Sequence, residues 1–96
     1  MGPLERLILC WAAARDDEQF SERDLLEGLG RTIPSLKLIQ VNRALNYMTA
    51  TYLLIGRQEK YWFYTPLLRR KMREVQDLDY LMSVLIREFR NTQGRG

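Results

Sequence analysis

The sequence predicts a mainly α-helical domain that contains one small β-hairpin, and three observations support this fold class. Over most of the chain, apolar residues recur every three or four positions, which is the spacing of one helical face. Residues 52–55 and 61–64 are instead short apolar and aromatic runs, and the polar break between them contains Gly56, as in a hairpin. Pro66 then suits the first turn of another helix, where its missing N–H costs nothing.

The composition is that of a single globular domain. The chain has 96 residues, of which 46% are hydrophobic and 28% charged, and this balance argues against disorder. One cysteine and no histidine exclude a disulfide framework and leave a zinc site without its usual ligands. No apolar run approaches the roughly 18 residues of a membrane span, so we expect a cytoplasmic protein without membrane contact. The net charge of +3 permits nucleic-acid binding without demanding it.

Two helices are predicted before the long middle one. The first covers residues 3–14, and its apolar face is formed by Leu4, Leu7, Ile8 and Trp11. The second begins at Ser21, because Ser21 and Asp24 have the spacing of a capping box. It is short, since two glycines close it at positions 28 and 30.

The third helix is predicted at residues 34–50. Its inward stripe consists of apolar residues at helical spacing, namely Leu38, Val41, Leu45, Met48 and Tyr52. The opposite face mixes polar and apolar residues: Leu36, Ile39, Gln40, Arg43, Asn46, Tyr47 and Ala50. The hairpin follows, with Arg57, Gln58, Glu59 and Lys60 at its tip.

A single long helix is predicted at residues 66–91. Five apolar residues step along it at alternating spacings of three and four, and they form a short heptad-like seam: Val75, Leu78, Met82, Leu85 and Phe89. Leu81 and Ile86 widen this apolar surface. Residues 1–91 are therefore expected to form one domain, and residues 92–96 a flexible tail.

This order of elements resembles a winged helix-turn-helix domain with three helices, a two-stranded wing and a long C-terminal helix. Residues 60–70, KYWFYTPLLRR, are similar to the junction between wing and last helix in the winged-helix domains that close many prokaryotic AAA and STAND-type ATPases. The resemblance covers about residues 4–73. It implies either an excised domain or a free-standing relative, because no phosphate-binding loop ending in Gly-Lys-Ser/Thr occurs in the chain.

The sequence predicts neither a catalytic residue nor a cofactor. Without histidine, a general base would need a carboxylate or lysine with a strongly shifted pKa, and no pattern marks one. Cys10 lies beside Trp11 in an apolar stretch, which favours a buried thiol over a nucleophile. We therefore expect a binding module.

Double-stranded DNA is the ligand that the resemblance implies. A winged helix lays its third helix in the major groove and rests its wing on the neighbouring backbone. The residues expected to contact DNA are Lys37, Gln40, Arg43, Asn46, Tyr47, Arg57, Lys60, Arg69 and Arg70. The alternative for each cation is an ordinary solvated surface. For the basic run at residues 69–73, that alternative includes ion pairs with Glu74 and Asp77.

A protein partner is the competing interpretation. Leu36, Ile39 and Tyr47 flank Arg43, and they either pack inward or form an apolar partner surface. A homodimer through the last helix is also predicted, with its contacts at Leu78, Leu81, Met82, Leu85 and Phe89. In the alternative arrangement, this helix bends back over Trp11 and the first helix.

Overall fold

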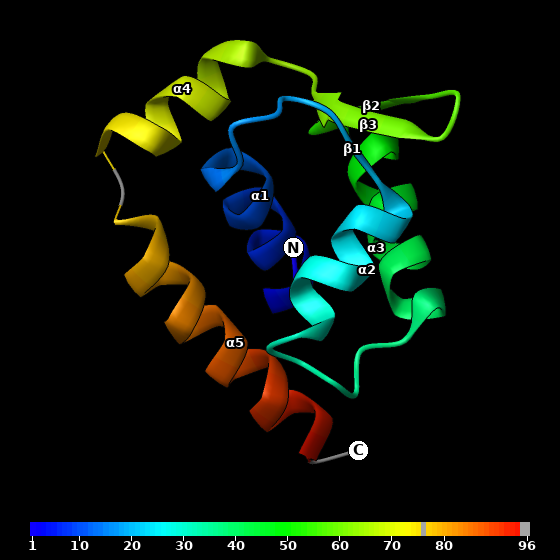
Figure 1. Cartoon of the computed structure of the whole chain (residues 1–96), viewed down its shortest axis with the longest axis vertical. Coiled ribbons are helices and arrows are strands. Elements are labelled where there is room, and N and C mark those ends of the chain that lie inside the picture. Colours follow the sequence, from blue (N-terminus) through cyan, green and yellow to red (C-terminus); the bar gives the residue numbers. More distant parts are fainter. Residues whose placement is uncertain (76, 95–96) are drawn as a thin grey trace.

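The structure is a computed structural model, and it describes residues 1–75 and 77–94. The elements in chain order are α1 (Pro3–Ala14), β1 (Phe20–Ser21), α2 (Glu22–Gly30), α3 (Leu38–Ala50), β2 (Leu54–Arg57), β3 (Lys60–Phe63), α4 (Pro66–Val75) and α5 (Leu78–Gly94). In Figure 1, α1 lies in the middle, with α2 and α3 on one side and α5 on the other. The sheet and α4 lie across one end. The expected mainly helical fold with a small hairpin is confirmed.

The sheet has three antiparallel strands in the order β1-β3-β2, one more than the sequence predicted. β2 and β3 form the expected hairpin, in which Ile55 lies opposite Trp62. β1 adds Phe20 opposite Tyr61, and the two rings stack at a centroid distance of 5.9 Å. A strand of two residues is too short to show a periodic pattern, so only the structure reveals it.

The hydrophobic core is built around α1. Leu7, Ile8 and Ala13 are fully buried, and they lie within a cluster to which α2, α3, the sheet and α5 all contribute. Cys10 belongs to the same cluster, as expected, and burial raises the pKa of its thiol. A buried thiol with a raised pKa is a poor nucleophile. Among the described residues, no helix is both long and apolar enough to cross a bilayer.

The capping box at the start of α2 is confirmed. Ser21 Oγ accepts a hydrogen bond from the Asp24 N–H at 3.0 Å, and the Ser21 N–H donates to Asp24 Oδ2 at 2.9 Å. This backbone hydrogen bond lowers the pKa of Asp24, because it stabilises the charged carboxylate. The two contacts satisfy N–H groups that have no partner within the helix.

The third helix starts later than predicted, at Leu38 instead of residue 34. The segment before it turns tightly, since the Ile33 N–H donates to the Leu29 carbonyl and the Leu36 N–H to the Ile33 carbonyl. This turn points Leu36 into the core, so its assignment to a partner surface is wrong. Leu38 was expected inside and is instead exposed, because the buried stripe runs through Val41, Ala44, Leu45 and Met48.

The end of α3 departs from the predicted inward stripe at Tyr52. The Tyr52 N–H donates to the Thr49 carbonyl, and the Leu53 N–H donates to the Met48 carbonyl. These two bonds are those of a Schellman motif, with Tyr52 in the left-handed conformation at φ 61°. The reversal of the backbone carries the Tyr52 side chain away from the core, and 70% of its surface is exposed.

The single helix predicted at residues 66–91 is wrong, because α4 ends at Val75 and α5 begins at Leu78. Asp77 explains the break. Its Oδ1 accepts from the Tyr80 N–H at 3.1 Å, and its carbonyl accepts from the Leu81 N–H, which is the geometry of a helix N-cap. α5 then runs back along α1 and continues through residue 94, so the predicted tail is helical at residues 92–94. Residues 95–96 lie outside the described part of the chain.

The reversal of α5 removes two of the five predicted dimer contacts from the surface. Leu85 and Phe89 are buried, and Leu78, Leu81 and Met82 are half-buried against the core of the same chain. α1 and α5 make the most extensive contact between any two elements. Leu85 and Phe89 are therefore covered within one chain, as in the alternative arrangement, whereas the Val75 side chain of the predicted seam lies outside the described part of the structure.

Candidate nucleic-acid interface

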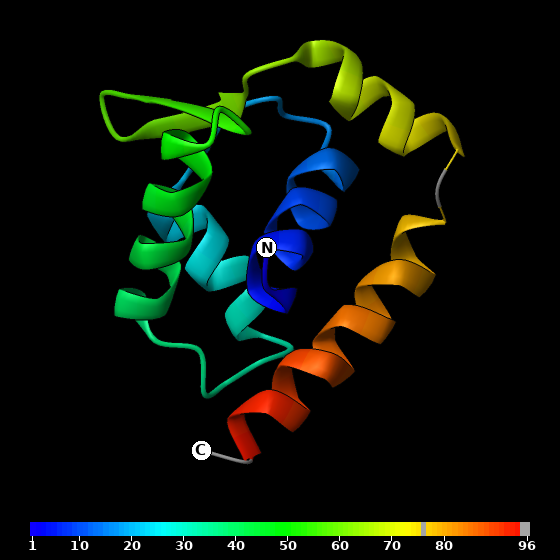
Figure 2. The ribbon, with the colours of Figure 1, turned by 180° about the vertical axis from the view of Figure 1, so that it is seen from behind.

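The outer face of α3 is exposed. Ile39, Arg43, Asn46 and Ala50 lie along its crest at spacings of four, three and four residues, and all are exposed. Arg43 has neither a hydrogen bond nor an ion pair from its side chain to any described residue. Lys37 precedes the helix and is also exposed. Figure 2 shows α3 on the outside of the domain, with the hairpin above its C-terminal end.

Two of the amides expected to read bases have structural contacts. Gln40 Oε1 accepts from the Lys37 N–H at 2.8 Å and so caps the start of α3. Asn46 Nδ2 donates to Asn42 Oδ1 at 3.2 Å, and Asn42 Nδ2 donates to Glu22 Oε1 at 3.1 Å. This short network links α3 to α2, and it places a carboxylate beside the helix face. Glu22 and Asn42 were not identified from the sequence, because no motif marks a contact over 20 positions.

The same face carries exposed apolar side chains. Ile39 is 57% exposed and Tyr47 is 43% exposed, so of the two alternatives left open by the sequence, inward packing does not hold for either residue. Leu38 joins them at the start of the helix. A face with one arginine, two asparagines and three large apolar residues differs from a simple basic surface.

The tip of the hairpin carries two of the predicted phosphate contacts. Arg57 and Lys60 lie opposite each other in the strand register, and both are exposed. Gln58 and Glu59 form the turn between them with φ values of 53° and 65°, as in a type I′ turn. Glu59 therefore stands beside the two cations and weakens the local positive potential.

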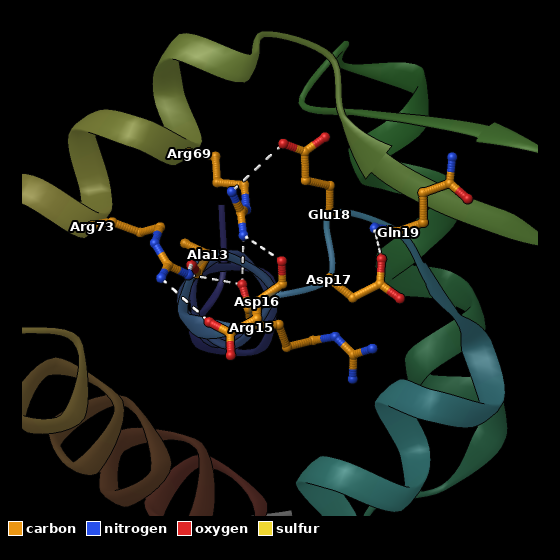
Figure 3. A network of polar contacts seen from close by, with 8 residues as sticks. All are labelled: Ala13, Arg15, Asp16, Asp17, Glu18, Gln19, Arg69 and Arg73. Atoms are coloured by element: carbon orange, nitrogen blue, oxygen red, sulfur yellow. Dashed lines mark hydrogen bonds and ion pairs between the residues drawn. The ribbon is translucent and has the colours of Figure 1, made fainter.

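Arg69 is not available to a ligand, which corrects its predicted role. Its Nη2 donates to the Arg15 carbonyl at 2.5 Å and to the Asp16 carbonyl at 3.4 Å, while Nη1 pairs with Glu18 at 3.8 Å. Figure 3 shows the side chain directed at the segment that leaves α1. The last carbonyl groups of a helix lack hydrogen-bond partners within the helix and carry a partial negative charge. The Arg69 guanidinium therefore binds at the C-terminal end of α1.

Arg73 makes the same kind of contact one turn further along α4. Its Nη1 donates to the carbonyls of Ala13 and Arg15, and its Nη2 lies 3.5 Å from Asp16 Oδ1. The ion pairs with Glu74 and Asp77, which belonged to the alternative of an ordinary surface, are absent among the described residues. Arg70, between the two arginines, is exposed and has no such contact.

The structure thus distributes the predicted DNA contacts that are exposed over three elements. Lys37, Arg43, Asn46 and Tyr47 lie on or beside the outer face of α3, and Arg57 and Lys60 lie at the hairpin tip. Arg70 belongs to α4. Within residues 1–75 and 77–94, no group of acidic or cysteine side chains is placed to hold a metal ion.

Comparison with known proteins gives no match to a protein family, to a curated protein or to a solved structure.

Proposed function

We propose that this chain is a winged-helix module that binds double-stranded DNA. In this assignment α1, α2 and α3 are the three helices and the β2–β3 hairpin is the wing. α3 enters the major groove, and the wing rests on the neighbouring backbone. The observation that supports the proposal best is the crest of α3, where Arg43 is exposed and has no competing contact. A guanidinium in that position can donate to a guanine edge or to a phosphate.

In this proposal, phosphate contacts contribute little to the affinity for DNA. Lys37, Arg57 and Lys60 are the other cations that this proposal assigns to phosphates, and Glu22 and Glu59 oppose them. Each phosphate contact adds about 0.9 to the slope of log affinity against log salt. Three or four contacts therefore predict a slope of about −3 to −4, which means weak and strongly salt-dependent binding.

A fluorescence anisotropy titration with random duplex DNA tests the proposal. Arg43→Ala is expected to weaken binding, and Lys60→Ala to lower the salt slope by about one. Arg87→Ala is the matched control, because Arg87 is an exposed cation on α5, on the other side of α1. If the wild-type protein does not bind duplex DNA at low salt, or if Arg87→Ala weakens binding as much as Arg43→Ala, the proposal is wrong.

A protein partner on the same helix is the second candidate, and the exposed apolar residues favour it. Leu38, Ile39 and Tyr47 surround an arginine, and protein interfaces are enriched in tyrosine and arginine. The double variant Ile39→Ser/Tyr47→Ser should change the free energy of unfolding by no more than about 0.5 kcal/mol per site, since both side chains are exposed. A defined partner that binds the wild type and not this variant, in the absence of DNA binding, would select this function.

A further inference from the structure

The sheet has one face that is turned away from the core. Side chains alternate along a strand, so Tyr61 and Phe63 face inward while Lys60, Trp62 and, one step beyond β3, Tyr64 face outward. The buried Phe63 and the exposed Tyr64 agree with this alternation. In the neighbouring strand β2, Ile55 lies opposite Trp62 and Arg57 lies opposite Lys60, so both side chains point to the same side. We call this surface the outer hairpin face, and its residues are Ile55, Arg57, Lys60, Trp62 and Tyr64.

Tyr52 extends the outer hairpin face, and it does so in a strained backbone conformation. Its ring meets the Tyr64 ring edge-on at a centroid distance of 5.6 Å. A left-handed φ costs a residue with a Cβ about 1 kcal/mol, and glycine is the usual residue at this position of a Schellman motif. Burial does not compensate the strain, because 70% of the Tyr52 surface is exposed. A strained residue with an exposed aromatic ring is a reason to expect a binding function.

A hollow of about 360 Å³ lies beside Trp62, between β3 and α4. Trp62, Pro66 and Arg70 line it, together with the side of α4 that carries Arg69 and Arg73. Its volume lies at the lower end of the range of small-molecule sites. An exposed guanidinium beside an indole can hold a flat ring by stacking and a phosphate by charge.

The charge on this surface is positive. Arg57, Lys60 and Arg70 are exposed, and none forms a side-chain hydrogen bond or ion pair with another described residue. The nearby carboxylates lie at its margins. Glu59 occupies the turn, and Glu18 and Glu74 line the hollow, where Glu18 pairs with Arg69. Cations therefore flank the rings of the outer hairpin face, with Arg57 and Lys60 at the hairpin tip and Arg70 beside Trp62.

We propose that the outer hairpin face binds single-stranded nucleic acid. Bases stack on Tyr52, Tyr64 and Trp62, and phosphates contact Arg57, Lys60 and Arg70. Aromatic side chains with interspersed cations are the combination that binds single strands, because every base has a flat face and every linkage a charge. In a duplex the bases are already stacked on each other, so the rings cannot reach them. This site is separate from the crest of α3, although both surfaces share the cations of the hairpin tip.

An anisotropy titration with a labelled thymine homopolymer of about 16 nucleotides tests this site. The double variant Tyr52→Ala/Tyr64→Ala should bind at least about 25-fold more weakly, which is about 5-fold for each stacked base that is lost. Tyr80→Ala is the matched control, because Tyr80 is 69% exposed and lies on α5. It should bind like the wild type.

Tryptophan fluorescence locates the contact independently. The chain has two tryptophans, and Trp11 packs edge-on against Phe20 with the Arg15 guanidinium over its ring. The Trp11→Phe variant, which retains only Trp62, should lose fluorescence when the homopolymer binds. The Trp62→Phe variant should show no such change.

The outcomes separate this inference from the proposed function. Arg43→Ala should reduce duplex binding and leave single-strand binding intact. The inference is overturned if the homopolymer does not bind, or if Tyr80→Ala is as defective as the double variant. The inference is also overturned if the double variant loses as much affinity for duplex DNA as for the homopolymer, since the two tyrosines would then belong to the duplex contact. A wild-type dimer that the double variant dissolves, without any nucleic-acid binding, would assign the surface to a second copy.

Discussion

Arg73 Nη1 donates a hydrogen bond to the Ala13 carbonyl oxygen at 2.9 Å, and this contact joins α4 to the last turn of α1 (Figure 3). The same nitrogen reaches the Arg15 carbonyl at 2.8 Å. The end of α1 is therefore satisfied by a side chain that comes from about 60 positions later in the chain.

Removal of this contact should destabilise the fold. We expect Arg73→Ala to lower the free energy of unfolding by about 1 kcal/mol, the net value of a hydrogen bond that stays partly in water. Arg70→Ala removes the same charge three residues earlier in α4, and it should change the free energy of unfolding by less than about 0.5 kcal/mol. Urea unfolding measures both. Equal effects of the two substitutions would mean that charge, and not the carbonyl contact, is what matters.

Leu85 should behave as a core residue. It is 3% exposed, so Leu85→Ala should cost about 2–5 kcal/mol through lost burial and a residual cavity. Leu67 is 54% exposed on α4, and Leu67→Ala is the matched control with little expected effect. Thermal and urea unfolding give the values. Sedimentation of the same variants would reveal an intersubunit role for Leu85 if the assembly changed without a loss of stability.

The turn of the hairpin can be relaxed by substitution. Gln58 and Glu59 both have positive φ, where asparagine and glycine are preferred in a type I′ turn. Gln58→Asn/Glu59→Gly should therefore raise the free energy of unfolding by about 1 kcal/mol. Glu59→Gln removes the same charge without relieving the backbone, and it should leave stability unchanged. Under the proposed function, loss of this charge should strengthen duplex binding for both proteins.

Acid should weaken the start of α2. The folded-state pKa of Asp24 is lowered, so the ionised carboxylate contributes stability at pH values above its ordinary unfolded pKa. That contribution is lost as the pH falls through the lower folded-state pKa. We expect Asp24→Asn to reduce stability near neutral pH and to make the unfolding free energy less dependent on pH below about 4. An unchanged acid profile would exclude the capping carboxylate as a source of this dependence.

Local signals in the sequence predicted local structure well. Ser21 and Asp24 lie three residues apart and make their contacts within one turn, so the pattern alone identified the cap. The hairpin was equally local. Asp77 is also a residue type that caps helices, and it caps the start of α5. The apolar spacing around it continued without interruption, however, and favoured one helix.

Contacts made by backbone groups without a sequence signature could not be predicted. The position of Leu36 depends on a turn against the end of α2, which shifts the start of α3. The partners of Arg69 are backbone carbonyls, which have no signature in the amino-acid sequence. At the candidate site, helical spacing identified Arg43 as an exposed cation. The short polar run at the hairpin tip identified Arg57 and Lys60. It missed Tyr52, since a left-handed residue at the helix end reverses the direction that helical spacing predicts.

The packing of α5 on α1 has a consequence for synthesis on the ribosome. Leu7 and Ile8 lie in a cluster that is completed by Leu85 and Phe89. The first helix is therefore made long before α5, and the side of α1 that α5 covers stays accessible until residue 89 has emerged. Such delayed burial slows folding and exposes a growing chain to aggregation. This domain is thus expected to need protection by a chaperone while translation continues.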